Sequence, residues 1–240
     1  VSTARPGMRL ATSVFLLFCI AALAMANGRR YVVDNVLISE SLPSLAIAVD
    51  DSFSYVGRHP VRIRDVAAGE RFVFVDTDHN RAERLLIVQF EGFLPGIDNH
   101  YRYDLGRSPV VAGYPFRSNG FAFNMPAAIE ANPGDEAAGT YRFLVEHGLL
   151  SPVDWMMWRS LTVAGEARRD EMIIFYVEGA DAMGLTLDDL YRDNAETETW
   201  RTIQQAMEMR ANLSFRLAPL DDDGRPLIDA WEAIPNRFQP

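Results

Sequence analysis

Three titratable side chains have positions suited to acid–base chemistry. Glu91 and Glu178 each follow a continuous apolar run of the kind that forms a buried strand. A carboxyl group desolvated at such a position has a raised pKa and acts as a general acid. His100 lies between two acidic residues and beside two tyrosines, at what would be the mouth of a cavity. Glu91, His100 and Glu178 are therefore candidate catalytic residues, and the alternative is that both strands simply reach solvent after their apolar runs.

Aromatic side chains supply a second set of candidates, for ligand binding rather than catalysis. Residues 105–120 are rich in glycine, proline and serine, and long loops of this kind often carry function. The run 155–158 holds two tryptophans and two methionines, which could hold a hydrophobic ligand or fill the core. The candidate ligand-binding residues are Tyr101, Tyr103, Tyr114, Phe116, Trp155 and Trp158.

Metal and cofactor motifs are weak or missing. The loop 76–79 offers two carboxylates and an imidazole, but aspartate also favours hairpin turns. The run 221–224 resembles half a calcium loop, yet Pro219 and Ala230 would occupy ligand positions. No G-x-S-x-G, H-E-x-x-H, P-loop or G-x-G-x-x-G pattern is found. We therefore predict no metal site and no cofactor.

Composition narrows the possible chemistry further. All 23 basic residues are arginine, so lysine Schiff bases and lysine general bases are excluded. Cys19 is the only cysteine, so its removal would leave neither disulfides nor thiol nucleophiles. The formal net charge of −10 repels nucleic-acid backbones and anionic lipid surfaces. Nucleic-acid partners are therefore not expected.

The N-terminal segment has the pattern of a secretory signal. Arg5 and Arg9 precede an apolar run over 10–26, which ends in Ala24-Met25-Ala26. We predict a signal peptide over 1–26, an exposed leader over 27–44 and a single α+β domain over 45–240. The protein would be exported to the periplasm or the medium. The alternative is an inner-membrane anchor formed by residues 10–26.

The hydrophobic pattern predicts strands first and helices late. Alternating or continuous apolar runs predict strands at 45–49, 53–57, 61–64, 72–75, 85–90, 121–125, 158–163, 172–177 and 213–217. Cap residues and helical spacing predict helices at 135–147, 151–157, 187–192 and 198–211. A short edge strand is also expected around Tyr101. In the last helix, Trp200, Ile203 and Met207 share an apolar stripe that faces the strands, and Glu208 lies on the solvated face.

Strands that follow one another without intervening helices favour a mainly antiparallel, twisted sheet. The predicted fold is therefore α+β, with two or three helices packed on one face of that sheet. The predicted function is an exported domain that binds a small apolar or amphipathic ligand or a protein partner. The alternative is a hydrolase or isomerase that uses the acidic residues and the histidine in a cleft.

Overall fold

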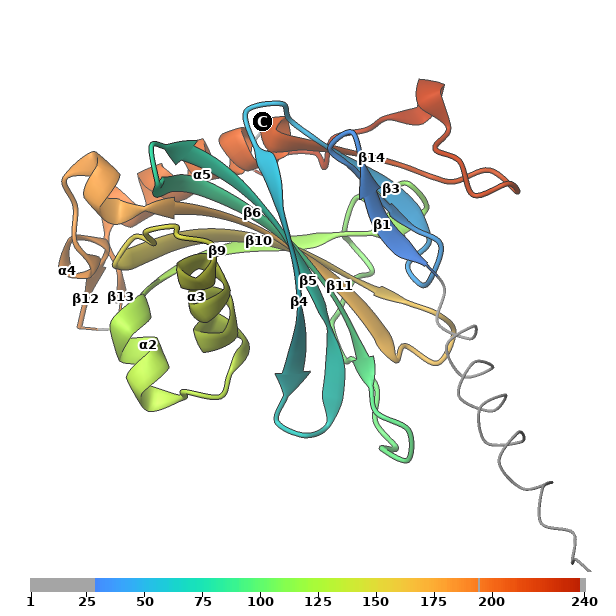
Figure 1. Cartoon of the computed structure of the whole chain (residues 1–240), viewed down its shortest axis with the longest axis horizontal. Helices are drawn as coiled ribbons and strands as arrows, with labels where there is room; N and C mark the ends of the chain where they lie inside the picture. Colours follow the sequence, from blue (N-terminus) through green and yellow to red (C-terminus); the bar gives the residue numbers. More distant parts are fainter. Residues whose placement is uncertain (1–28, 194, 238–240) are drawn as a thin grey trace, which may run out of the picture.

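The computed structural model describes residues 29–193 and 195–237, which form two antiparallel sheets with helices around them (Figure 1). The predicted signal peptide and Cys19 lie outside the described residues. Within the described ranges, no helix is long and apolar enough to cross a membrane. The predicted class, α+β with mainly antiparallel strands, is confirmed.

The larger sheet has six strands in the order β4-β5-β6-β11-β10-β9, and every neighbouring pair is antiparallel. Its strands are β4 (Ser54–Ile63), β5 (Ala67–Asp78), β6 (Arg81–Phe93), β9 (Arg117–Asn124), β10 (Asp154–Ala164) and β11 (Asp170–Gly179). The strands predicted at 72–75 and 85–90 are confirmed as parts of β5 and β6, which form a hairpin. The two short strands predicted between 53 and 64 are one strand, β4, with a bulge near Gly57.

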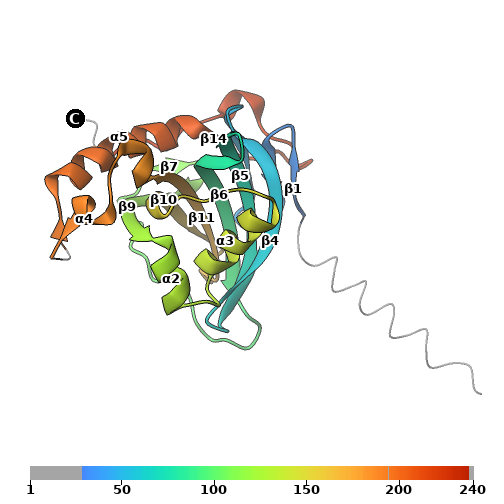
Figure 2. The same cartoon turned by 60° about the vertical axis from the view of Figure 1, so that its left-hand side comes forward.

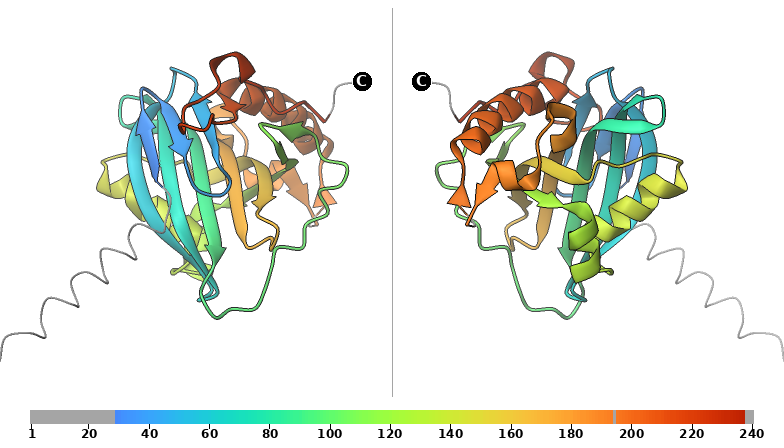
Figure 3. Two further views of the ribbon diagram at one scale, coloured as in Figure 1. Left: turned by 90° about the vertical axis from the view of Figure 1, so that its right-hand side faces the viewer. Right: turned by 90° about the vertical axis from the view of Figure 1, so that its left-hand side faces the viewer.

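The smaller sheet has the order β1-β2-β3-β14 and packs beside the larger one (Figure 3). It consists of β1 (Arg30–Val33), β2 (Val36–Ser39), β3 (Leu45–Val49) and β14 (Phe215–Ala218). The segment predicted to be an exposed leader therefore forms two strands instead. Leu37 is fully buried there, because β2 pairs with β3 and one face of β2 packs in the core.

Two hydrophobic cores lie on opposite faces of the six-stranded sheet, because side chains alternate along each strand. Phe72 and Phe74 join the core that the four-stranded sheet and α5 (Glu198–Ser214) complete. Val73 and Val75 join the core that α2 (Met125–Ala131) and α3 (Glu136–Glu146) cover. The helices thus cover both faces, as Figure 2 shows, and the prediction of helices on one face is wrong.

The remaining elements are short. They are β7 (Val110–Val111), β8 (Tyr114–Pro115), β12 (Tyr191–Arg192), β13 (Ala195–Glu196), α4 (Leu187–Leu190), and the 3₁₀ turns η1 (Ala180–Met183) and η2 (Ile228–Ala230). Residues 94–109, between β6 and β7, contain no strand, so the edge strand predicted near Tyr101 is wrong. This connection is held by backbone carbonyls that accept hydrogen bonds from Arg168 and Arg169, at the turn before β11.

The helix predicted over 151–157 is also wrong, since Trp155 to Met157 belong to β10. A continuous apolar run is compatible with either structure, and pairing with β9 and β11 on both sides selects the strand. The helix predicted over 198–211 is confirmed as α5, with Trp200 and Met207 fully buried against the sheet. Glu208 is 1% exposed rather than solvated, because the C-terminal segment lies against it. The backbone N–H of Arg237 in that segment donates to the Glu208 carboxylate at 2.8 Å.

Candidate functional site

An open groove with a volume of about 1120 Å³ lies where the first strands of the two sheets meet. Strands β4, β5 and β6 supply one wall, and β1 with the segment after β2 supplies the other. Its lining mixes apolar and charged groups, among them Leu42, Phe90, Phe93, Leu94, Arg30, Arg58, Glu70, Glu91 and Asp170. Pockets for small molecules have this size and this combination of apolar walls with a few polar groups.

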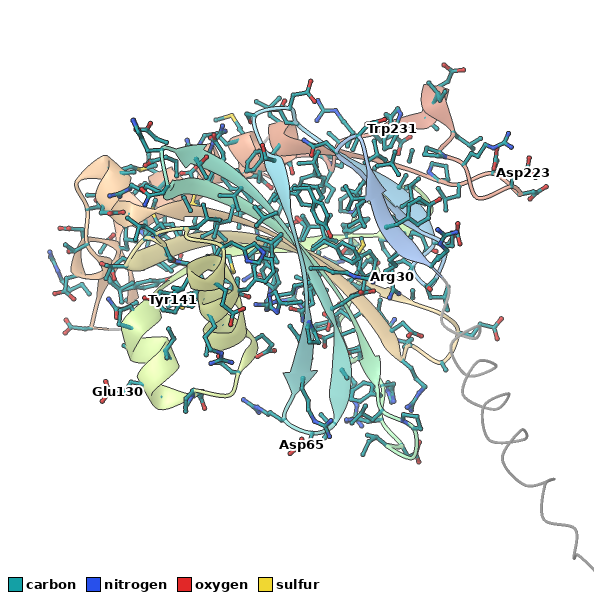
Figure 4. All side chains as sticks on the ribbon, viewed as in Figure 1. Arg30, Asp65, Glu130, Tyr141, Asp223 and Trp231 are labelled. Carbon is teal, nitrogen blue, oxygen red and sulfur yellow. The ribbon has the colours of Figure 1, made fainter. Side chains whose placement is uncertain are left out.

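Two arginines of the groove share one carboxylate. Glu70 accepts from Arg30 at 3.4 Å and from Arg58 at 3.2 Å. The Arg30 guanidinium also stacks 4.2 Å from the centre of the Phe90 ring and donates to the carbonyl of Leu42 at 2.9 Å. Figure 4 places Arg30 between β1 and the larger sheet. The guanidinium of Arg30 therefore ties the two sheets together and forms the floor of the groove.

Asp170 is a carboxylate of the groove that has neither an ion pair nor a hydrogen bond among residues 29–193 and 195–237. Burial raises the pKa of Asp170, although the charges of Arg30 and Arg169 oppose this shift. A half-buried, unpaired carboxylate beside Gly92 leaves the groove with negative charge to offer to a ligand.

A pair of carboxyl groups lies on the other face of the six-stranded sheet, which α2 and α3 cover. Glu91 in β6 and Glu171 in β11 are directly opposite each other in register, so their side chains share a face. The Tyr101 hydroxyl donates to Glu91 at 2.7 Å, and the Gln89 amide donates to the same carboxylate. Glu171 is 2% exposed, and its Oε1 has no hydrogen-bond partner among the described residues.

The protonation of this pair follows from its surroundings. Burial, and then the charge of Glu91, raises the pKa of Glu171 to about 8, while a hydrogen bond from Tyr103 and the charge of Arg159 oppose the shift. Burial and the charge of Glu171 raise the pKa of Tyr103 to about 12. At neutral pH Glu171 therefore holds its proton, and the Tyr101 and Tyr103 phenols beside it stay neutral.

Two arginines on the same face do not contact the pair directly. Arg71 donates to Gln89 at 2.5 Å, to Thr140 at 2.6 Å and to a backbone carbonyl of α3. Burial lowers the pKa of Arg71 to about 10. Arg159 donates twice to the Asn119 side chain, at 3.1 and 3.0 Å. Their positive charges lie near the carboxyl pair, but their donors are directed to neutral groups.

The three predicted catalytic residues are not brought together. Glu91 and Glu178 lie on opposite faces of the sheet, because Glu178 is seven positions from Glu171 along β11. Glu178 is bound by Arg210 at 2.6 and 2.7 Å and accepts a hydrogen bond from Tyr176, so it forms a structural ion pair. His100 is exposed, in the connection between β6 and β7. Of the three, only Glu91 lines the groove.

The predicted aromatic ligand-binding residues are divided between the two cores. Tyr101 and Tyr103 are half-buried and stacked, with ring centres 6.2 Å apart, beside the carboxyl pair. Trp155 is buried on that same face, whereas Trp158 and Phe116 are buried on the other. The last of the set, Tyr114, accepts a hydrogen bond from the backbone of Ser44 at 2.9 Å. None of the six lines the groove.

The sequence reasoning missed Arg30, Asp170 and Glu171. Arg30 falls in the predicted leader, and Asp170 and Glu171 directly precede the strand predicted at 172–177. A usable signal was present, because in an antiparallel pair the end of one strand lies opposite the start of the other. Glu91 ends one apolar run and Glu171 begins another, so their meeting could have been proposed once the two strands were paired.

Comparisons with protein-family models, with curated proteins and with solved structures found no match. Across residues 29–193 and 195–237, no cluster of three or more acidic, histidine or cysteine side chains has the arrangement of a metal site. The function must therefore be argued from the groove and from the carboxyl pair.

Proposed function

We propose that this protein binds a small amphipathic ligand that carries a positive charge, and that it does so in the groove between the two sheets. The observation that carries the proposal is the unpaired carboxylate of Asp170 in a groove with apolar walls. An alkyl or aromatic portion would pack on Phe93, Leu94 and Leu42, and the cationic group would lie beside Asp170.

Charge supports a cationic ligand over an anionic one. Glu70 already pairs with both Arg30 and Arg58, so an anion would compete with that carboxylate for the two guanidinium groups. A cation at Asp170 would meet a carboxylate that has no hydrogen bond or ion pair among the described residues, and it would share that charge with the nearby Arg30 and Arg169. The net charge of −10 also attracts cations over a longer range and repels anions. Export would expose the groove to ligands outside the cytoplasm, if the predicted signal sequence is used.

Two probes of matched length and opposite permanent charge test the proposal. Hexyltrimethylammonium and hexyl sulfate are titrated into the protein and followed by calorimetry. We expect saturable binding of the cation and at least tenfold weaker binding of the anion. Asp170→Asn should weaken binding of the cation by about tenfold, which corresponds to ~1.4 kcal/mol.

The matched control is Glu130→Gln, which removes one exposed carboxylate from α2, away from the groove (Figure 4). This variant should bind the cation as the unmodified protein does. Preference for hexyl sulfate would assign the head group to Arg30 and Arg58 and contradict the proposed charge. Absence of binding for both probes would contradict the groove as a ligand site, and native mass spectrometry of the purified protein would then identify any ligand retained elsewhere.

A further inference from the structure

Residues 219–230, which follow β14, form an arm that projects from the smaller sheet. Figure 4 shows Asp223 at its far end, away from both sheets. The arm is closed by a backbone hydrogen bond from Leu227 to Pro219 at 3.0 Å. At its turn, the Asp221 carboxylate accepts from two backbone N–H groups at 2.9 and 2.8 Å. The arm is therefore ordered by its own hydrogen bonds, although none of its residues is buried.

The arm presents two aliphatic side chains to solvent. Leu227 is 42% exposed and Ile228, in η2, is 80% exposed, the highest value for a large hydrophobic residue in the described ranges. Asp229 follows them, is also exposed, and has neither an ion pair nor a hydrogen bond from its side chain within residues 29–193 and 195–237. A preorganised backbone that holds apolar side chains outward loses little conformational entropy on binding.

A second groove, with a volume of about 380 Å³, lies on the outer side of α5. Met209 and Leu213, one helical turn apart, form one wall, and Ile234 and Pro235 of the C-terminal segment form the other. Leu213 is 67% exposed, second only to Ile228 among the large hydrophobic residues that the structure describes. The two most exposed aliphatic side chains therefore belong to a projecting arm and to an apolar groove.

The charges beside these two features are opposite. Arg216 lines the groove, and its guanidinium donates only to the backbone carbonyls of Asn212 at 2.7 Å and Phe215 at 3.0 Å. It has no carboxylate partner in the described part of the chain. On the arm, the carboxylate of Asp229 directly follows Ile228. An arm that enters this groove would bring an unpaired carboxylate to an unpaired guanidinium.

We propose that the arm of one molecule docks into the α5 groove of a second copy, with Leu227 and Ile228 against Met209 and Leu213. The arm is held away from the groove of its own chain. At its base, Leu217 and Glu232 exchange two backbone hydrogen bonds of 2.8 Å, and Ile228 stays exposed. Exchange of both arms gives a dimer with two-fold symmetry, which buries twice the area of a single contact.

This inference is independent of the proposed function, because the two grooves share no lining residue. Sedimentation equilibrium of the purified protein over a range of concentrations tests it. We expect a reversible dimer, and Ile228→Asp and Leu213→Asp should each raise its Kd by at least about tenfold. Asp229→Asn should raise it by about two- to fivefold, as the loss of an exposed ion pair does.

The matched control is Val110→Asp, because Val110 in β7 is 65% exposed and lies on neither the arm nor the groove. This variant should dimerise as the unmodified protein does. A protein that stays monomeric at every concentration contradicts the proposal. A dimer that survives both Ile228→Asp and Leu213→Asp contradicts it as well. A dimer that is lost in Leu213→Asp but kept in Ile228→Asp shows that another segment fills the groove, and overturns the role of the arm.

Cross-linking gives a second measurement that does not depend on weakened variants. Cys19 is the only cysteine, so Cys19→Ser provides a background without thiols. In that background, Ile228→Cys and Leu213→Cys are purified separately, mixed and oxidised with copper phenanthroline. We expect a disulfide-linked dimer that contains one chain of each variant. A mixture of Ile228→Cys with Val110→Cys is the control and should give none. Equal cross-linking in the two mixtures, or none in either, overturns the contact between the arm and the groove.

Discussion

Strand β11 carries a buried carboxylate near each end, and the two are stabilised in opposite ways. Glu178 is 6% exposed and has a bidentate partner in Arg210, with Arg84 at the paired position in β6. Glu171 is 2% exposed and has a second carboxyl group, Glu91, at its paired position. At one end a guanidinium balances the buried charge, and at the other a proton removes it.

The difference shows which end is structural and which is available for function. Glu178, Tyr176 and Arg210 form a closed set that joins β11 to α5. Their hydrogen bonds are made within the protein, so nothing is left for a ligand. At the Glu171 end, one carboxylate oxygen has no described partner and Glu91 borders a groove. Buried charges are tolerated when they are paired, and the unpaired end therefore points to a role outside stability.

The largest effect should come from breaking the paired end. Arg210→Ala leaves Glu178 buried without its guanidinium partner, which should lower the free energy of unfolding by about 3–5 kcal/mol. Denaturant unfolding at pH 7 measures this. The double variant Arg210→Ala with Glu178→Gln should recover part of the loss, because no uncompensated charge remains. Equal stability of the unmodified protein and Arg210→Ala would show that the ion pair does not hold α5 on the sheet.

A smaller effect of opposite sign is expected at the unpaired end. In the unfolded chain Glu171 loses its proton near pH 4.5, but in the folded protein it does so near pH 8. Its contribution to stability is therefore present below pH 4.5 and is lost as pH rises through about 8. Glu171→Gln does not titrate, so this variant should match the unmodified protein at pH 4.5 and exceed its stability at pH 9 by a few kcal/mol.

Denaturant unfolding at pH 4.5, 7 and 9 tests this second prediction. Glu178→Gln is the matched control on the same strand, and it should be less stable than the unmodified protein because Arg210 loses a charged partner. A Glu171→Gln variant that is equally destabilised at all three pH values would show that Glu171 is ionised and paired, as Glu178 is. The contrast between the two ends of β11 would then disappear.

The sequence predicts the helices and strands around these carboxylates better than it predicts the contacts between them. The strands at 72–75 and 85–90, the helix over 135–147 and the helix over 198–211 are confirmed, because long periodic or continuous apolar runs determine them. The helix predicted over 151–157 is wrong, since the apolar residues 155–157 fit a helix or a strand and only pairing on both sides decides. Helix placement on both faces depends on packing that local patterns do not encode.

The candidate site could be predicted only in part from the sequence, for a similar reason. Glu91 could be singled out from its position after an apolar run, and Glu178 by the same argument. Which of them is neutralised depends on residues distant in sequence: Arg210 approaches from α5, and Glu171 lies 80 residues beyond Glu91. A shift of one residue in the pairing register of either strand would move its side chains to the opposite face of the sheet. The sequence therefore identifies the carboxylates, and the sheet register decides their chemistry.

The smallest expected effects come from removing the tyrosine hydroxyl that lies beside each of these two carboxyl groups, Tyr176 beside Glu178 and Tyr103 beside Glu171. Tyr176 is 1% exposed and donates to the carboxylate of Glu178, which is ion-paired with Arg210, so Tyr176→Phe should lower the free energy of unfolding by about 1.5–3 kcal/mol at pH 7. Tyr103 is half-buried and donates to a carboxyl group that is protonated at that pH. Tyr103→Phe should therefore cost less than about 1 kcal/mol at pH 7.

The two tyrosine variants should also differ in how their cost depends on pH. The hydrogen bond from Tyr103 favours ionised Glu171, so its removal should raise the pKa of Glu171 above about 8. The cost of Tyr103→Phe should then grow between pH 7 and 9, because only the ionised carboxylate uses that hydrogen bond fully. The cost of Tyr176→Phe should change less over the same interval, since Arg210 binds both carboxylate oxygens of Glu178. Unfolding curves at both pH values give the two differences, and a constant cost for Tyr103→Phe would mean that Glu171 does not change its charge there.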